Sequence, residues 1–137
     1  MNIFSFFSGA GFLDLGFETQ GHFNVVFVNE FHKAFNDVYA RKNMNLPMPI
    51  YGHHVEDITL YLDAEHQERL AALKAMVEES KAHQLTGFIG GPPCPDFSVA
   101  GKNRGRNGDN GRLSGTYASL ICEAMPDFFL FENVKGL

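Results

Sequence analysis

The residue with the clearest chemical potential in this sequence is Cys94, which stands between Pro93 and Pro95 in the stretch GGPPCPDFS. A cysteine that only fills a core needs no such framing, since buried thiols are common and usually inert. The Gly- and Asn-rich segment that follows contains four cations, Lys102, Arg104, Arg106 and Arg112. Because nearby cations favour the thiolate, we interpret Cys94 as a nucleophile, held rigidly and followed by a segment that we expect to be mobile.

A thiolate that adds to an aromatic ring requires an acid, because the electrons pushed into the ring must be neutralised. Glu132 ends the apolar run in DFFLFENV and is the best candidate. A carboxyl group at that position could be partly desolvated and protonated, which suits general acid catalysis. The alternative is an ordinary carboxylate at the end of a strand, and the residues alone leave the two readings open.

A glycine turn and a second carboxylate form another candidate site. FSGAG contains Gly9 and Gly11, which would let backbone N–H groups approach a ligand, and Glu30 follows about 20 residues later. A carboxylate at that spacing can accept hydrogen bonds from ribose hydroxyls. Asp14 stands where the dinucleotide fingerprint has its third glycine, so a nucleoside without a pyrophosphate fits better than NAD. The alternatives are a tight turn and, for Glu30, a charge at a helix N-terminus.

These residues require a scaffold in which strands alternate with helices. Apolar and β-branched runs predict strands over residues 2–7, 23–28, 87–90 and 127–134, and helical periodicity predicts helices over 12–21, 30–43, 63–83 and 117–125. This alternation predicts an α/β fold, a doubly wound and mostly parallel sheet. Ligands of such sheets lie beyond the carboxyl ends of the strands, where Gly9, Glu30, Asp57, Cys94 and Glu132 all fall.

Within this scaffold, Asn29 is expected to cap the second helix, whose apolar stripe contains Phe31, Ala34, Phe35, Val38 and Tyr39. In the third helix, Leu70, Leu73, Met76 and Val77 form the buried stripe. Cys122 is expected in the core beside Leu120 and Ile121, and the six histidines are expected on the surface.

Composition limits the remaining classes of function. The chain has 137 residues, a net charge of −5 and 45% hydrophobic residues, which indicates one globular domain without a general nucleic-acid-binding surface. No run of residues is long enough to span a membrane, and the N-terminus lacks a basic signal region, so we expect a cytoplasmic protein. Two cysteines at this spacing predict neither a metal site nor a disulfide.

The motifs together resemble the amino-terminal part of a DNA cytosine-5 methyltransferase. FFSGAGFLDLGFE is similar to the family's first motif, NEF to its second, EDI to its third, GGPPCPDFS to its catalytic fourth and FENV to its sixth. They occur in the family's order over essentially all 137 residues. The resemblance implies a Rossmann-like, S-adenosylmethionine-dependent methyltransferase fold, here incomplete, of restriction-modification type.

Residue roles follow from the resemblance alone. It assigns Phe7, Gly9, Gly11, Glu30, Asp57, Ile58 and Pro93 to S-adenosylmethionine: Phe7 and Ile58 flank the adenine, Glu30 holds the ribose and Asp57 hydrogen-bonds the adenine amino group. It implies that Cys94 attacks C6 of a flipped-out cytosine in double-stranded DNA and that Glu132 holds the N3 and N4 edge of that base. Ser98, Lys102, Arg104 and Arg106 are expected to contact nucleic acid.

The chain also departs from the family. Pro95 replaces a glutamine, the fifth motif is blurred in DNGRLSGTY, and no target-recognition domain is recognisable. We therefore expect residues 1–137 to be a partial catalytic domain, either a fragment or one subunit of a split enzyme, inactive or nearly so alone. The alternatives are a fragment of a tRNA cytosine-5 methyltransferase and a non-catalytic cofactor-binding remnant, which would oligomerise through its exposed apolar surface.

Overall fold

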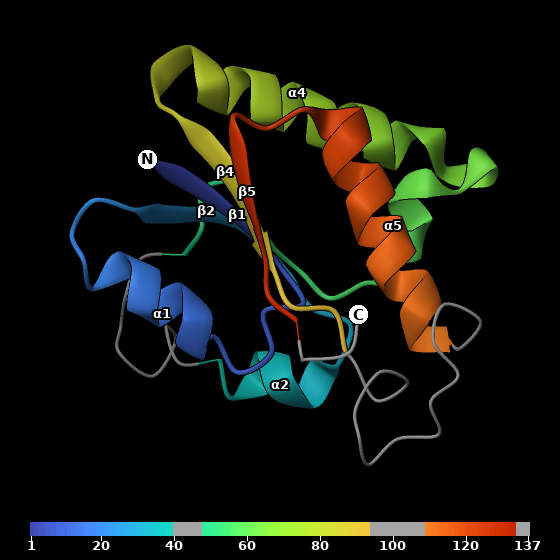
Figure 1. Ribbon diagram of the computed structural model, residues 1–137, viewed down its shortest axis with the longest axis horizontal. Helices are drawn as coiled ribbons and strands as arrows, with labels where there is room; N and C mark the ends of the chain where they lie inside the picture. The colour runs from blue at the N-terminus through green and yellow to red at the C-terminus, as the bar shows by residue number, and fades with distance from the viewer. Residues whose placement is uncertain (40–47, 94–108, 134–137) are drawn as a thin grey trace.

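The computed structural model describes residues 1–39, 48–93 and 109–133 (Figure 1). Its elements, in chain order, are β1 (Asn2–Phe6), α1 (Phe12–Glu18), β2 (Asn24–Asn29), α2 (Lys33–Asp37), β3 (His53–His54), the 3-10 helices η1 (Ile58–Leu62) and η2 (Ala64–His66), α4 (Gln67–His83), β4 (Thr86–Gly90), α5 (Asp109–Ala124) and β5 (Phe128–Phe131). The described strands form one parallel sheet in the order β3-β2-β1-β4-β5. The predicted doubly wound α/β fold is confirmed.

The strand order places β1 at the centre, with β2 on one side and β4 on the other. Chain connections therefore leave β1 in one direction and β4 in the other, which produces the crevice where α/β sheets bind ligands. The glycine turn after β1 and the proline-rich turn after β4 open onto the same edge of the sheet because the strands are parallel.

Helices cover both faces of the sheet, α4 and α5 on one side and α1 on the other, and the short helix α2 lies near the carboxyl ends of the strands (Figure 1). The larger core lies under α4, α5 and η1, where aromatic rings from the strands pack closely; the Phe6 and Phe88 ring centroids are 4.8 Å apart. Leu73 and Val77 of α4 are fully buried against this cluster, with Leu70 and Met76 partly buried beside them, as the sequence predicts.

The strands divide their side chains between the two faces with one irregularity. The pairing of β1 with β2 skips Val26, so that Val26 and Phe27 both contribute to the larger core. The smaller core, on the opposite face, takes Val25 and Val28 instead. A β-bulge of this kind explains why consecutive residues of β2 break the usual alternation.

The second helix differs from its prediction. Asn29 does not cap it, because this residue ends β2 and pairs with β1 and β3; the helix α2 begins only at Lys33, after His32. The predicted buried stripe is also wrong, since Phe31, Phe35 and Val38 are exposed and Tyr39 alone is fully buried. The remainder of the predicted helix, residues 40–43, lies outside the described residues.

The last helix also differs from its prediction. α5 begins at Asp109, eight residues before the predicted start, despite Gly111 and Gly115. Packing of Tyr117, Leu120 and Ala124 against the sheet outweighs the low helix propensity of these glycines, which costs about 1 kcal/mol each. Cys122 is exposed rather than in the core, because it falls on the opposite side of the helix from this stripe.

Two further observations concern the histidines and the membrane. His53 and His54 form the short edge strand β3 and are half-buried, so the predicted surface role does not hold for this pair. Among the described residues, no helix combines the length and the apolar character that crossing a membrane requires.

Candidate functional site

A cavity of about 560 Å³ lies at the carboxyl ends of the strands. This volume is typical of small-molecule sites. Its lining consists of Phe7, Gly9, Asn29, Glu30, Phe31, His32, Phe35, Asp57, Ile58, Gly91, Pro93 and Leu113. Six of the seven residues that the family resemblance assigns to a cofactor therefore line one cavity, and Gly11 is the exception.

Glu30 is nearly buried and joins two parts of the cavity wall. Its Oε2 accepts a hydrogen bond from the Gly9 N–H at 2.8 Å, and its Oε1 accepts one from the His32 N–H at 2.7 Å. The carboxylate therefore fixes the glycine turn after β1 against the segment after β2. Since α2 begins only at Lys33, Glu30 is not a simple charge at a helix N-terminus.

The turn after β1 has an unusual backbone. Phe7 has a φ of 53° and Gly9 a φ of 55°, both in the left-handed region. For phenylalanine this conformation is strained, and such strain concentrates at functional sites. The Phe7 ring meets Tyr117 edge-on, with centroids 5.9 Å apart. Burial raises the pKa of Tyr117 far above its ordinary value of 10.0, so this phenol stays neutral.

Asp57 and Ile58 form another wall, where β3 passes into η1. The Asp57 Oδ1 accepts hydrogen bonds from the N–H and the hydroxyl of Thr59, at 2.9 and 2.8 Å, and so caps η1. Ile58 is buried, in the larger core. A carboxylate and an apolar side chain are thus presented side by side, as a heterocyclic base with polar edges would require.

Gly91 and Pro93 form the wall that follows β4. A Cβ atom on Gly91 would lie 2.7 Å from the Glu132 Oε2, so the glycine is what allows Glu132 to approach this turn. Glu132 itself does not line the cavity, and its side chain is exposed. The described residues therefore do not provide the desolvation expected for this carboxyl group.

Gly11 has a structural reason to be glycine. Its φ is 81°, and a Cβ atom here would lie 2.4 Å from the Tyr39 Cε2. The buried Tyr39 donates its hydroxyl hydrogen to the Asp14 carboxylate, which also accepts a hydrogen bond from Ser5 Oγ at 2.6 Å. Asp14, which replaces the third glycine of the dinucleotide fingerprint, thus anchors the chain after α2.

The predicted nucleophile and the predicted nucleic-acid contacts cannot be located in this site. Cys94, Ser98, Lys102, Arg104 and Arg106, together with Pro95, lie outside the described residues. Arg112, the last cation of that segment, is exposed in the first turns of α5. The predicted mobility of the segment does not hold for residues 109–112, which are helical.

Sequence reasoning missed half of the cavity lining. The sequence predicts a helix that contains Phe31, His32 and Phe35, yet Phe31 is 60% exposed and lines the cavity. The His32 ring packs edge-on against both phenylalanines, with centroids 5.2 and 5.7 Å apart. The available signal was the NEF motif itself, because an aromatic residue directly after a ligand-binding carboxylate is well placed to contact the same ligand.

The fold and the cavity define an α/β domain with a cavity of small-molecule size at the carboxyl ends of its parallel strands. A scan against protein families matches the description C-5 cytosine-specific DNA methylase over residues 1–137. The chain therefore belongs to the C-5 cytosine-specific DNA methylase family.

Two curated relatives place the chain within that family. It is 55% identical over 137 residues to the Type II methyltransferase M.NmeDI of Neisseria meningitidis serogroup C, covering 98% of this chain and 32% of the relative. It is 31% identical to the Type II methyltransferase M.AquIA of a Picosynechococcus strain, covering 98% of this chain and 49% of the relative. The chain thus spans about a third to a half of these relatives.

A solved structure supports the fold independently. The DNMT2 E260A/E261A/K263A mutant of Spodoptera frugiperda matches with a TM-score of 0.54 at 18% identity, covering 98% of this chain and 36% of that one. At this identity the similarity concerns the fold alone.

Proposed function

We propose that this chain is the cofactor-binding and catalytic part of a DNA cytosine-5 methyltransferase of restriction-modification type. The observation that carries the proposal is the cavity after β1, β2 and β4, in which Phe7, Glu30, Asp57 and Ile58 meet. Family membership and the names of the relatives support DNA cytosine as the substrate.

The cavity lining fits S-adenosylmethionine, which supplies an electrophilic methyl group. In this proposal Phe7 and Ile58 contact the two faces of the adenine. Asp57 accepts a hydrogen bond from the adenine amino group. Glu30 accepts hydrogen bonds from the ribose hydroxyls, since each of its oxygens has a second lone pair beyond the present bonds to the Gly9 and His32 amides. Pro93 closes the side that leads to the target base.

Catalysis is assigned to Cys94 and Glu132. The thiolate of Cys94 forms a bond to C6 of a cytosine that has left the duplex, and the C5–C6 electron pair becomes available at C5. Glu132 holds the N3 edge and donates a proton there. C5 then takes the methyl group from the sulfonium, which leaves as a neutral thioether. Transfer of the C5 proton to a base expels the Cys94 thiolate, and return of the N3 proton to Glu132 restores the ring. The approach of Glu132 to Gly91, three residues before Cys94, supports this assignment.

Catalysis is expected to need segments beyond these 137 residues, either in the same polypeptide or in a second one. β5 forms one edge of the described sheet, and Phe129 is 59% exposed. An exposed apolar edge strand is a site for pairing with further strands. A segment that covers this edge and carries the target-recognition function is therefore the proposed partner, besides double-stranded DNA.

Binding and methyl transfer test this function separately. Calorimetry of the chain with S-adenosylhomocysteine should detect binding that Glu30→Ala weakens about tenfold or more, since charged hydrogen bonds are lost. Glu68→Ala, a change of an exposed glutamate on α4, is the matched control. In a protein that contains the remaining segments, Cys94→Ser should abolish methyl transfer to DNA but retain cofactor binding. Unchanged methyl transfer would rule out the mechanism.

The same experiment separates the two alternative functions. A tRNA cytosine-5 methyltransferase would methylate tRNA in preference to DNA under identical conditions. A non-catalytic remnant would bind S-adenosylhomocysteine, assemble into oligomers through its exposed apolar residues and transfer no methyl group. Light scattering of the purified chain measures this assembly, and a monomer argues against the remnant.

A further inference from the structure

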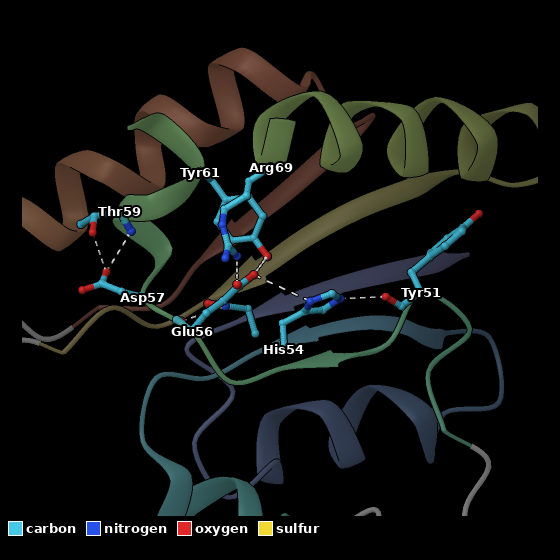
Figure 2. Close-up of polar contacts among 8 residues, drawn as sticks. Tyr51, His54, Glu56, Asp57, Thr59, Tyr61 and Arg69 are labelled. Carbon is cyan, nitrogen blue, oxygen red and sulfur yellow. Dashed lines mark hydrogen bonds and ion pairs between the residues drawn. The ribbon is translucent and has the colours of Figure 1, made fainter. Parts of the chain in front are cut away.

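Glu56, which does not line the cavity, lies at the centre of a group of polar contacts beside it (Figure 2). Its Oε1 accepts a hydrogen bond from the Tyr61 hydroxyl at 2.6 Å, and its Oε2 accepts one from Arg69 of α4. His54 Nδ1 lies 3.7 Å from Oε1, and this ring is fixed by the Tyr51 carbonyl, 2.9 Å from its Nε2. The side chain of Glu56 is only 17% exposed.

The partners of Glu56 make its position well defined. Burial raises the pKa of Tyr61 well above its ordinary value of 10.0, so its phenol remains a hydrogen-bond donor at all physiological pH values. Arg69 offers a permanent positive charge, which compensates a carboxylate that is largely removed from water. The His54 ring stacks on Phe27 with centroids 4.8 Å apart, which ties the group to the larger core.

The main chain of Glu56 connects this group to the cavity. Its carbonyl oxygen accepts a hydrogen bond from the Asn29 side chain at 3.0 Å, and Asn29 lines the cavity. The Asn29 carbonyl in turn accepts the Ser8 N–H at 3.3 Å. The side chain of Glu56 is therefore held by η1 and α4. Its carbonyl group is held by Asn29, which also supports the glycine turn after β1.

The residue that this arrangement orients is Asp57. Neighbouring carboxylates would repel each other if they shared a direction, but Figure 2 shows Glu56 directed toward Tyr61 and Arg69, and Asp57 directed toward Thr59. Within the described chain, the side-chain hydrogen bonds of Asp57 go through Oδ1. Its other oxygen, Oδ2, is thus available to a ligand in the cavity.

We propose that Glu56, together with Arg69 and Tyr61, is a positioning residue that sets the preference of the cavity for adenine through Asp57. Glu56 does not contact the ligand. It fixes the peptide between β3 and η1, so that the Asp57 carboxylate accepts a hydrogen bond from a purine amino group and repels a purine carbonyl. This inference rests on the proposed binding of S-adenosylmethionine.

The ratio of the affinities for two related ligands tests the positioning role more specifically than the affinity for one ligand does. S-adenosylhomocysteine and S-inosylhomocysteine differ in that the amino group on the purine is replaced by a carbonyl oxygen and the neighbouring N1 gains a proton. The chain should bind the adenine compound about tenfold or more tightly, the effect of one hydrogen bond to a charged acceptor. Glu56→Gln and Arg69→Gln should reduce this ratio to about threefold or less, mainly by weakening the adenine compound.

Lys74→Gln is the matched control, because Lys74 lies on the same helix and pairs at the surface with Glu123, 3.4 Å away. This variant should keep the ratio of the unchanged chain. Equal weakening of both ligands by Glu56→Gln and Arg69→Gln would show a general structural role and would overturn the inference. A chain that binds neither compound would overturn the proposed function, and the inference with it.

Hydrogen exchange of the ligand-free chain provides a second measurement that does not depend on the cofactor. The Thr59 amide donates to Asp57 and should exchange faster in Glu56→Gln and Arg69→Gln, whereas the amide of Ile89 in the inner strand β4 should not. An unchanged Thr59 rate in both variants would overturn the positioning role even if the chain binds S-adenosylhomocysteine. Arg69→Gln, a change of a half-buried residue, keeps the test available if Glu56→Gln fails to fold.

Discussion

Replacement of Gly11 by alanine should destabilise the chain strongly, through two separable effects. The first is conformational, since Gly11 has a φ of 81° and a residue with a Cβ atom loses about 1–2 kcal/mol in this region. The second is steric, since the new Cβ atom would lie 2.4 and 2.6 Å from two atoms of the Tyr39 ring. The ring cannot move away easily, because it is buried and its hydroxyl is bonded to Asp14.

The size of each effect follows from the structure. Overpacking of a rigid interior costs about 1–3 kcal/mol, so Gly11→Ala should lose about 2–5 kcal/mol in total. Gly9 also has a positive φ, of 55°, but nothing within 4 Å of its Cβ position, so Gly9→Ala should lose only about 1–2 kcal/mol. Gly16 lies within α1 with equally open surroundings, so Gly16→Ala should gain about 0.5–1 kcal/mol.

Urea unfolding of the three variants, followed by circular dichroism, measures these differences in the free energy of unfolding. The lower flexibility of alanine in the unfolded chain affects all three variants alike and cancels in the comparison. The difference between Gly11→Ala and Gly9→Ala therefore reports the contact with Tyr39. Equal losses in these two variants would refute the steric argument, and a gain in stability for Gly11→Ala would refute both parts.

Three further predictions concern the core and the surface. Stability should fall as the pH rises above about 10, because burial raises the pKa of Tyr61 and Tyr117 in the folded chain only. The unfolded chain therefore loses these protons at a lower pH than the folded chain does, which favours unfolding. Tyrosinate absorbance should rise together with the loss of folded structure. Leu73→Ala, at a fully buried position of α4, should lose about 2–5 kcal/mol in urea unfolding, whereas Leu85→Ala, 60% exposed, should lose much less. Cys122→Ser should change stability by less than about 0.5 kcal/mol, and a thiol reagent should modify Cys122 in the folded chain.

The strands and the site at their carboxyl ends were predictable because both depend on local signals. Buried parallel strands appear as continuous apolar runs, and β1, β2, β4 and β5 agree with the predicted strands to within a few residues at each end. Glu30, Asp57 and Pro93 then follow strand ends, and the parallel arrangement brings them to one edge. The parallel topology therefore explains why residues that are far apart in the sequence line one cavity.

The errors arose where tertiary contacts outweigh local preference. Asn29 is a good helix cap by residue type, but sheet pairing and its bond to Glu56 hold it in β2. Phe31 and Phe35 have helical spacing, yet α2 has only five residues and leaves these rings at the cavity. Periodicity indicates which side chains share a face but not whether that face packs on a core or borders a ligand site.

Contacts between distant residues were not accessible from the sequence. The bond between Asp14 and Tyr39 joins residues 25 positions apart, and that between Glu56 and Arg69 joins residues 13 positions apart. In the sequence, Asp14 is distinguished only by its departure from a glycine pattern. An acidic residue on the buried face of a short helix does indicate a hydrogen-bond partner elsewhere in the chain. Which residue is that partner can be known only from the fold.

The two attachments of the segment from Glu30 to Tyr39 also constrain its length. Glu30 is bonded to the Gly9 amide and Tyr39 to Asp14, so both ends of the segment are fixed to the same turn and the helix that follows it. One inserted or deleted residue between them would rotate Tyr39 away from Asp14 or pull Glu30 from Gly9. Related sequences should therefore keep the number of residues that this segment contains.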